Sequence, residues 1–108
     1  EVACKVWPQG SMDADFLEPF ESTVLVLILS GETDPITPPE NGAKAHAMFS
    51  NSQHLVVPAH GHGVIGRGCV PSLVRDFVAS ASFEDLNPDC IERERAMPFF
   101  IDSTGPKL

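Results

Sequence analysis

Two residues of the sequence could act together in acid–base chemistry, an aspartate and a histidine that each follow a strand-like run. Asp34 comes shortly after the apolar run Thr23–Leu29, and His62 comes shortly after the shorter run His54–Val57. If these runs form neighbouring parallel strands, their carboxyl ends meet at one edge of the sheet, where ligands and catalytic groups collect. The spacing therefore predicts that the side chains of Asp34 and His62 lie within hydrogen-bonding reach.

Such a pair supplies two of the three parts of a nucleophile–base–orienter relay. The carboxylate holds the imidazole in one tautomer and stabilises the imidazolium that forms when the base takes a proton. The third part is a serine on a Gly-x-Ser-x-Gly turn, and the sequence contains no such pentapeptide. In one chain order of this relay the serine precedes the acid and the histidine. The sequence is therefore predicted to be the C-terminal part of an enzyme whose nucleophile lies upstream.

Each of these residues also has a plainer explanation. Asp34 precedes a proline, where aspartate is common in turns, and His62 stands between two glycines. His54, His60 and His62 could together bind a metal ion, but the loop lacks a carboxylate or cysteine at the spacings typical of zinc and copper sites. No metal and no cofactor is therefore predicted, and His60 is expected to be a neighbour of the site. Glu32 is expected to be a solvated loop acid, with a supporting role at the site as the alternative.

The segments before and after Asp34 indicate a strand and a helix. Residues 24–29 are apolar at every position, which favours a strand covered on both faces, as in a parallel sheet. Thr37 and Glu40 fit a capping box, in which each side chain bonds to the backbone at the start of a helix. That helix is expected to run to about Phe49.

The second half of the chain repeats the order of strand and helix. A short strand over residues 54–57 is closed by a proline, and a glycine-studded loop over 59–68 follows it. A second helix is predicted over about Val70–Ala81, because its apolar residues recur at helical spacing. Residues 83–90 are expected to form a turn or short helix that ends at Asn87-Pro88, and Met97–Ile101 an extended packing segment.

This order of elements predicts an α/β fold with parallel strands and flanking helices. Two strands are too few for an independent parallel sheet, so we expect an incomplete sheet. Residues 1–22 are expected to be an irregular entry segment from a missing lid or N-terminal part, 23–101 a C-terminal subdomain and 102–108 a tail. The unpaired edge of the first strand is a template for pairing, so the isolated chain is expected to self-associate.

The segments around Asp34 and His62 resemble a known protein family. Residues 31–39, Gly-Glu-Thr-Asp-Pro-Ile-Thr-Pro-Pro, are similar to the Gly-Glu-x-Asp-Pro-x-Thr-Pro-Pro signature of the C-terminal region of tripeptidyl-aminopeptidase-like (TAP-like) α/β-hydrolases. Residues 55–64 are similar to the Val-Val-Pro-…-Gly-His-Gly-Val segment of that family. Further matches are Cys4…Trp7-Pro8, Cys69-Val70-Pro71 and Cys90, so the resemblance spans roughly residues 4–100.

The resemblance implies the C-terminal part of an α/β-hydrolase fold, and a secreted or periplasmic serine exopeptidase that releases short N-terminal peptides. Asp34 would be the acid and His62 the general base of its Ser-Asp-His triad, acting on a peptide substrate in the full-length protein. The serine and the lid that helps to set specificity are absent from this sequence, so this chain alone is predicted to be inactive. The alternatives are a non-catalytic α/β binding or interaction module and a metal-binding protein.

The sequence contains three cysteines, and because three is an odd number at least one is free or pairs outside the chain. Cys69 opens the second predicted helix, and the segment from Ala81 to Cys90 is long enough to return to the start of that helix. A Cys69–Cys90 disulfide is therefore predicted, with Cys4 pairing to a cysteine in the missing part. Such bridges imply an oxidising compartment.

The composition argues against two classes of partner. The formal net charge is −8, and only seven Lys and Arg are spread along the chain. Phosphate binding depends on clustered basic residues, so no nucleic-acid partner is expected. The longest apolar run, Val24–Leu29, is far shorter than the ~20 residues of a membrane-spanning helix.

The chain begins with Glu1 and no leader follows, so it is expected to be a processed product, an excised domain or the ordered part of something longer.

Overall fold

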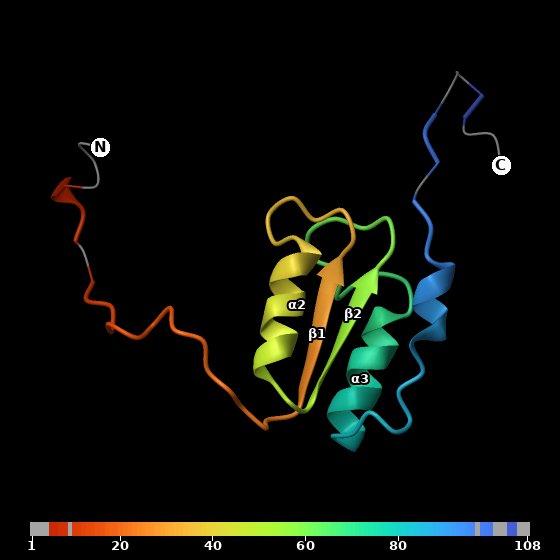
Figure 1. The fold of residues 1–108 in the computed structure, drawn as a ribbon. Coiled ribbons are helices and arrows are strands. Elements are labelled where there is room, and N and C mark those ends of the chain that lie inside the picture. The colour runs from red at the N-terminus through yellow and green to blue at the C-terminus, as the bar shows by residue number, and fades with distance from the viewer. Residues whose placement is uncertain (1–4, 9, 97, 101–103, 106–108) are drawn as a thin grey trace.

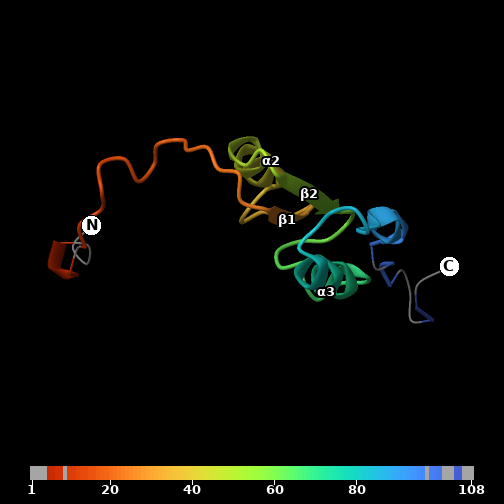
Figure 2. The same ribbon diagram turned by 90° about the horizontal axis from the view of Figure 1, so that it is seen from below.

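Two parallel strands lie between two helices. The computed structural model describes residues 5–8, 10–96, 98–100 and 104–105. Strands β1 (Val26–Gly31) and β2 (Ser52–Val57) form the sheet, connected by helix α2 (Pro39–Met48) and followed by helix α3 (Val70–Ser80) (Figure 1). Figure 2 shows α2 and α3 on opposite faces of the sheet. The predicted α/β architecture with a parallel strand pair and flanking helices is confirmed.

The apolar core lies on the α3 face of the sheet. Leu29 of β1 is the register partner of Leu55 of β2, and Gly31 is the partner of Val57. Successive side chains of a strand point to opposite faces, so this face collects the odd-numbered residues of both strands. The buried residues of the core are Leu55, Val57, Val64, Val70, Leu73 and Ile91. The first half of the apolar stripe predicted for α3 packs in this core through Val70, Leu73 and Val74, whereas Val78 of the same stripe is 72% exposed.

The opposite face, under α2, is polar. The Nε2 atom of His54 lies 2.9 Å from the Oγ atom of Ser30. Gly42 of α2 lies directly over this pair, because a methyl group at that position would come within 2.6 Å of Ser30 Oγ. Burial, and after it the neighbouring His46, lower the pKa of His54, so its imidazole is neutral at neutral pH. No residue of α2 is fully buried, so this layer contributes little apolar packing.

The first strand and the helix after it differ from the predicted limits. β1 begins at Val26 rather than Thr23 and continues to Gly31, since its partner strand pairs with it to that point. The predicted capping box is wrong. Pro38, not Thr37, precedes the first turn of α2, and no side chain caps it. The hydroxyl of Thr37 donates to the carboxylate of Asp34 at 2.7 Å.

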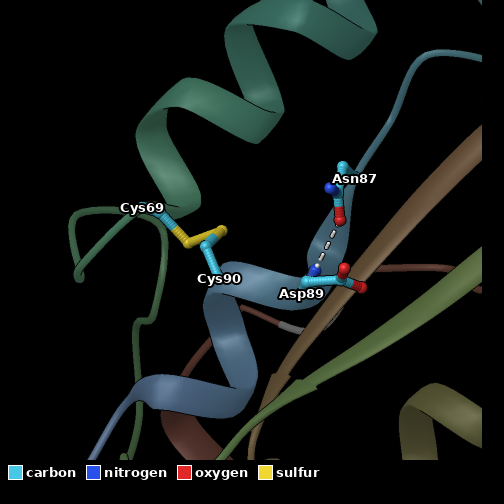
Figure 3. Close-up of a disulfide and its surroundings, with 4 residues drawn as sticks. All are labelled: Cys69, Asn87, Asp89 and Cys90. Atoms are coloured by element: carbon cyan, nitrogen blue, oxygen red, sulfur yellow. Dashed lines mark hydrogen bonds between the residues drawn. A yellow bond between two sulfur atoms is a disulfide. The ribbon is translucent and has the colours of Figure 1, made fainter.

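The second half of the chain also departs from the prediction at its boundaries. β2 begins at Ser52, and α3 ends at Ser80 with Ala81 in the left-handed conformation. Asn87 does not end a short helix but begins one. Its side chain accepts a hydrogen bond from the Asp89 amide at 2.9 Å and so starts the 3-10 helix η1 (Pro88–Arg93) (Figure 3).

The chain outside this α/β unit is largely exposed. Residues 10–21 lead away from the sheet (Figure 1), and Trp7 is 76% exposed. Phe99 and Phe100, the described aromatic residues of the predicted packing segment Met97–Ile101, are also exposed, so that prediction is wrong for them. Most of the predicted tail 102–108 lies outside the described residues. None of the described helices is long and apolar enough to cross a membrane.

A disulfide joins the start of α3 to η1. The bridge links Cys69 to Cys90, whose Cα atoms are 6.3 Å apart and whose sequence separation is 21 (Figure 3). Cys69 caps α3, and Ile91, next to Cys90, is buried in the core. The bridge therefore fixes η1 against the sheet and its helix. Cys4, whose partner was expected elsewhere, lies outside the described residues.

Removing this disulfide is expected to destabilise the protein substantially. A cross-link that closes a loop of about 20 residues restricts the unfolded chain, and its loss costs about 3 kcal/mol in the chain-entropy model. The paired substitution Cys69→Ser and Cys90→Ser should lower the free energy of unfolding in urea by that amount. Thiol titration of the unreduced, denatured chain should find no more than one free thiol. Three free thiols would show that the bridge does not form.

We propose that the 108-residue chain self-associates through the free edge of β1. Among the described residues β2 is the only strand paired with β1, and an unpaired apolar edge is a template for another chain. Light scattering should detect a species larger than a monomer. The substitution Val26→Lys places a charge on the edge strand and should shift the population toward monomer. A strictly monomeric unsubstituted chain at high micromolar concentration would contradict the proposal.

Candidate active site

Asp34 and His62 meet just beyond the carboxyl ends of β1 and β2. The Nδ1 atom of His62 lies 2.9 Å from the Oδ2 atom of Asp34. The side chain of Asp34 is 4% exposed, whereas that of His62 is 54% exposed. No residue that the structure describes hydrogen-bonds to the Nε2 atom of His62. The pair therefore combines a buried carboxylate with an imidazole whose second nitrogen is accessible.

Asp34 is held by four hydrogen bonds. Its Oδ1 atom accepts from the amides of Ile36, at 2.8 Å, and Thr37, at 3.0 Å. Its Oδ2 atom accepts from the Thr37 hydroxyl, at 2.7 Å, and faces His62. Burial raises the pKa of Asp34, but the bonds from the amide and hydroxyl of Thr37, the amide of Ile36 and His62 hold it well below its ordinary value. The carboxylate is therefore ionised across the physiological range.

The surroundings of Nδ1 determine the tautomer of His62. The Thr37 Oγ1 atom lies 3.2 Å from Nδ1, but its single proton goes to the closer carboxylate oxygen of Asp34. Both atoms that face Nδ1 are therefore acceptors, and Nδ1 must carry the proton. The Nε2 atom is left with a lone pair directed away from Asp34, which is the state a general base requires.

The loops that carry Asp34 and His62 are bonded to each other at consecutive positions. The amide of Glu32 donates to the carbonyl of Val57, and the amide of Thr33 donates to the carbonyl of His60, both at 3.0 Å. Between these two bonds, the Glu32 carboxylate accepts from the amide of Ala59 at 2.7 Å. Glu32 is therefore an exposed loop acid, as expected, that also bonds to the second loop, as the alternative of a supporting role requires.

Gly31 allows the two loops to approach this closely. A methyl group at Gly31 would lie 2.5 Å from the carbonyl oxygen of His60 and would also overlap that of Gly61. Carbon and oxygen atoms do not approach so closely without displacement of the backbone. The absence of a side chain at Gly31 therefore determines how near the loop of His62 lies to the end of β1.

The other histidines of the region are turned elsewhere. His60 Nδ1 lies 2.8 Å from the carbonyl oxygen of Pro58, within its own loop. His54 contacts Ser30 under α2, on the other face of the sheet from the core. The three histidines weighed as a metal site are thus not brought together, and the described part of the chain contains no group of three or more His, Cys, Asp or Glu side chains placed to hold a metal ion.

Open space adjoins the accessible side of the pair. A hollow of about 300 Å³ is lined by Asp34, Thr37 and His62 together with Leu29 and Ile65. None of the serines that the structure describes hydrogen-bonds to His62.

An acid after one parallel strand and a histidine after the next, with helices on both faces of the sheet, is the arrangement found at the C-terminal end of α/β-hydrolases. The comparison with protein families agrees. The model of the TAP-like protein family matches residues 1–90, and the chain belongs to that family. The resemblance seen in the sequence is thereby confirmed. No curated protein and no solved structure matches the chain.

Proposed function

We propose that this chain is the C-terminal part of a serine hydrolase and supplies the acid and the base of its catalytic triad. The full-length protein, in this proposal, joins the chain to an upstream part that carries the serine on a Gly-x-Ser-x-Gly turn. The observation that carries the proposal is the 2.9 Å hydrogen bond between Asp34 and His62 beyond the carboxyl ends of two parallel strands. Apolar packing does not explain why a buried, ionised carboxylate lies beside an accessible imidazole.

In this mechanism the Nε2 atom of His62 removes the proton of the serine hydroxyl as its oxygen attacks the substrate carbonyl. The ionised carboxylate of Asp34 stabilises the imidazolium that results. His62 then gives the proton to the leaving amine, and the acyl-enzyme is hydrolysed when His62 activates water in the same way. The relay needs no metal and no cofactor.

We infer an exopeptidase that releases short N-terminal peptides and acts in a secreted or periplasmic setting. Membership of the TAP-like protein family supports a hydrolase, and the peptide substrate is what the resemblance of residues 31–39 and 55–64 to tripeptidyl-aminopeptidase-like enzymes implies. The Cys69–Cys90 disulfide supports an oxidising compartment, because such bridges rarely persist in the reducing cytosol. The activity on peptides belongs to the full-length protein.

A fluorophosphonate probe tests the proposal, because it labels only an activated serine. The 108-residue chain should remain unlabelled and should not hydrolyse peptide-anilide or ester substrates above background. The full-length protein should be labelled at one serine, and labelling should fail in its His62→Ala variant. Labelling of the 108-residue chain, or no labelling of the folded full-length protein, would sink the proposal. The second outcome would favour a non-catalytic interaction module.

A further inference from the structure

We infer that Glu32 is a positioning residue, which holds the loop of His62 against the loop of Asp34 through a single side-chain hydrogen bond. The inference rests on the proposed function for its effect on catalysis. The contact itself is independent of that function. It joins the Oε2 atom of Glu32 to the amide of Ala59 at 2.7 Å.

The chain turns sharply where this bond is made. Between the end of β2 and His62, Ala59 adopts a φ of +56°, a left-handed conformation that residues other than glycine rarely adopt. The turn points the amide of Ala59 out of the loop and toward Glu32. A carboxylate that accepts this amide at short range forms a charge-assisted bond, which is stronger than one between neutral groups. Glu32 therefore stabilises an unfavourable turn that the path to His62 requires.

The position of this bond indicates what it controls. It lies between two backbone bonds, from the Glu32 amide to Val57 and from the Thr33 amide to His60. Asp34 follows Thr33 directly on one loop, and His62 follows His60 after one residue on the other. The bonded segment thus sets the separation of the two loops immediately before the residues of the relay, and Glu32 contributes its one side-chain bond.

Glu32 is exposed and is not part of the buried core, so its removal should change the loop more than the stability of the whole protein. The Glu32→Ala variant of the full-length protein should show faster hydrogen exchange in a peptide covering residues 57–62. Its kcat should fall roughly tenfold, as expected when one hydrogen bond to a charged group is lost. Its KM and melting temperature should change little.

Two further variants make the test specific. Glu32→Gln retains an acceptor oxygen at the same reach, so it should restore most of the exchange protection and most of kcat. Glu84→Ala removes an equal charge from an exposed glutamate whose side chain makes no hydrogen bond or ion pair to the described residues, and it should match the unsubstituted protein. Unchanged protection in Glu32→Ala, or a Glu32→Gln variant as impaired as Glu32→Ala, would overturn the inference.

The His62→Ala variant separates the two possible failures. If His62→Ala is inactive while Glu32→Ala retains full kcat and protection, the inference about Glu32 is wrong and the proposed function stands. If His62→Ala remains active, the proposed function is wrong, and hydrogen exchange still decides whether Glu32 holds the loop.

Discussion

If the proposed triad is correct, turnover by the full-length protein should be lost when His62 is replaced by alanine, because the serine then has no base to take its proton. Asp34→Asn should lower kcat by about 10⁴-fold, the effect known for the same change in a serine protease, where the amide favours the wrong imidazole tautomer. In this structure the Thr37 hydroxyl, freed from the carboxylate, could then donate to Nδ1 across the 3.2 Å that separates them.

These two variants are measured by steady-state kinetics on a peptide-anilide substrate, with circular dichroism to verify folding. His46→Ala is a suitable control, because His46 is an exposed histidine that contacts Ser52 rather than the relay. It should retain full turnover. Unchanged turnover in His62→Ala, or an Asp34→Asn variant as active as the control, would remove the assignment of these residues.

Substitution of Gly31 by alanine should reduce kcat/KM by about 100-fold without touching either residue of the relay. The added methyl group would overlap the carbonyl oxygens of His60 and Gly61, so the loop of His62 must move away from β1. A misplacement of about 1 Å in a catalytic group can cost that factor. The effect should appear mainly in kcat, since the displaced loop carries His62.

Gly66→Ala is the matched control for this prediction. Gly66 lies in the glycine-studded loop that carries His62, but a methyl group there would meet no atom within 4 Å. Its kinetics should therefore equal those of the unsubstituted protein. A Gly31→Ala variant with full activity would show that the close approach of the two loops is not needed for turnover.

The meeting of Asp34 and His62 could be predicted because it depends on strand order alone. Each residue follows a run with strand character, and parallel strands place their carboxyl ends together. The approach of Cys69 and Cys90 could be predicted for a similar reason, since chain length sets how far a segment can return. Both predictions used the order of the elements and the number of residues between them, which the sequence gives directly.

The roles of Thr37 and Glu32 could not be predicted in the same way. The segment 37–40 matches a capping box by residue type, but α2 begins one residue later, with Pro38 as the residue before its first turn. Thr37 thus lies outside the helix, and its hydroxyl donates to Asp34. The contact of Glu32 depends on the left-handed turn at Ala59, and an alanine gives no sequence signal for that conformation.

The polar pair under α2 was missed because the first strand is uniformly apolar only up to Leu29. Ser30 and His54 lie on the same face because their strands are parallel and pair in this register. The register of two strands is set by tertiary packing, and a short strand with polar residues can pair in more than one register. The sequence therefore predicted that the first strand is covered on both faces, but it did not predict that the face under α2 is polar.

The single crossover β1–α2–β2 has a consequence for how a complete enzyme would assemble. Asp34 and His62 are separated by 28 residues, and one hydrogen-bonded strand pair closes that loop. The entropic cost of closing a loop rises only slowly with its length. The acid–base pair is therefore expected to form within this chain, without the upstream part. A serine arriving from upstream would then complete the enzyme by docking onto a preformed surface, and a chain cut before β1 could regain activity through fragment complementation.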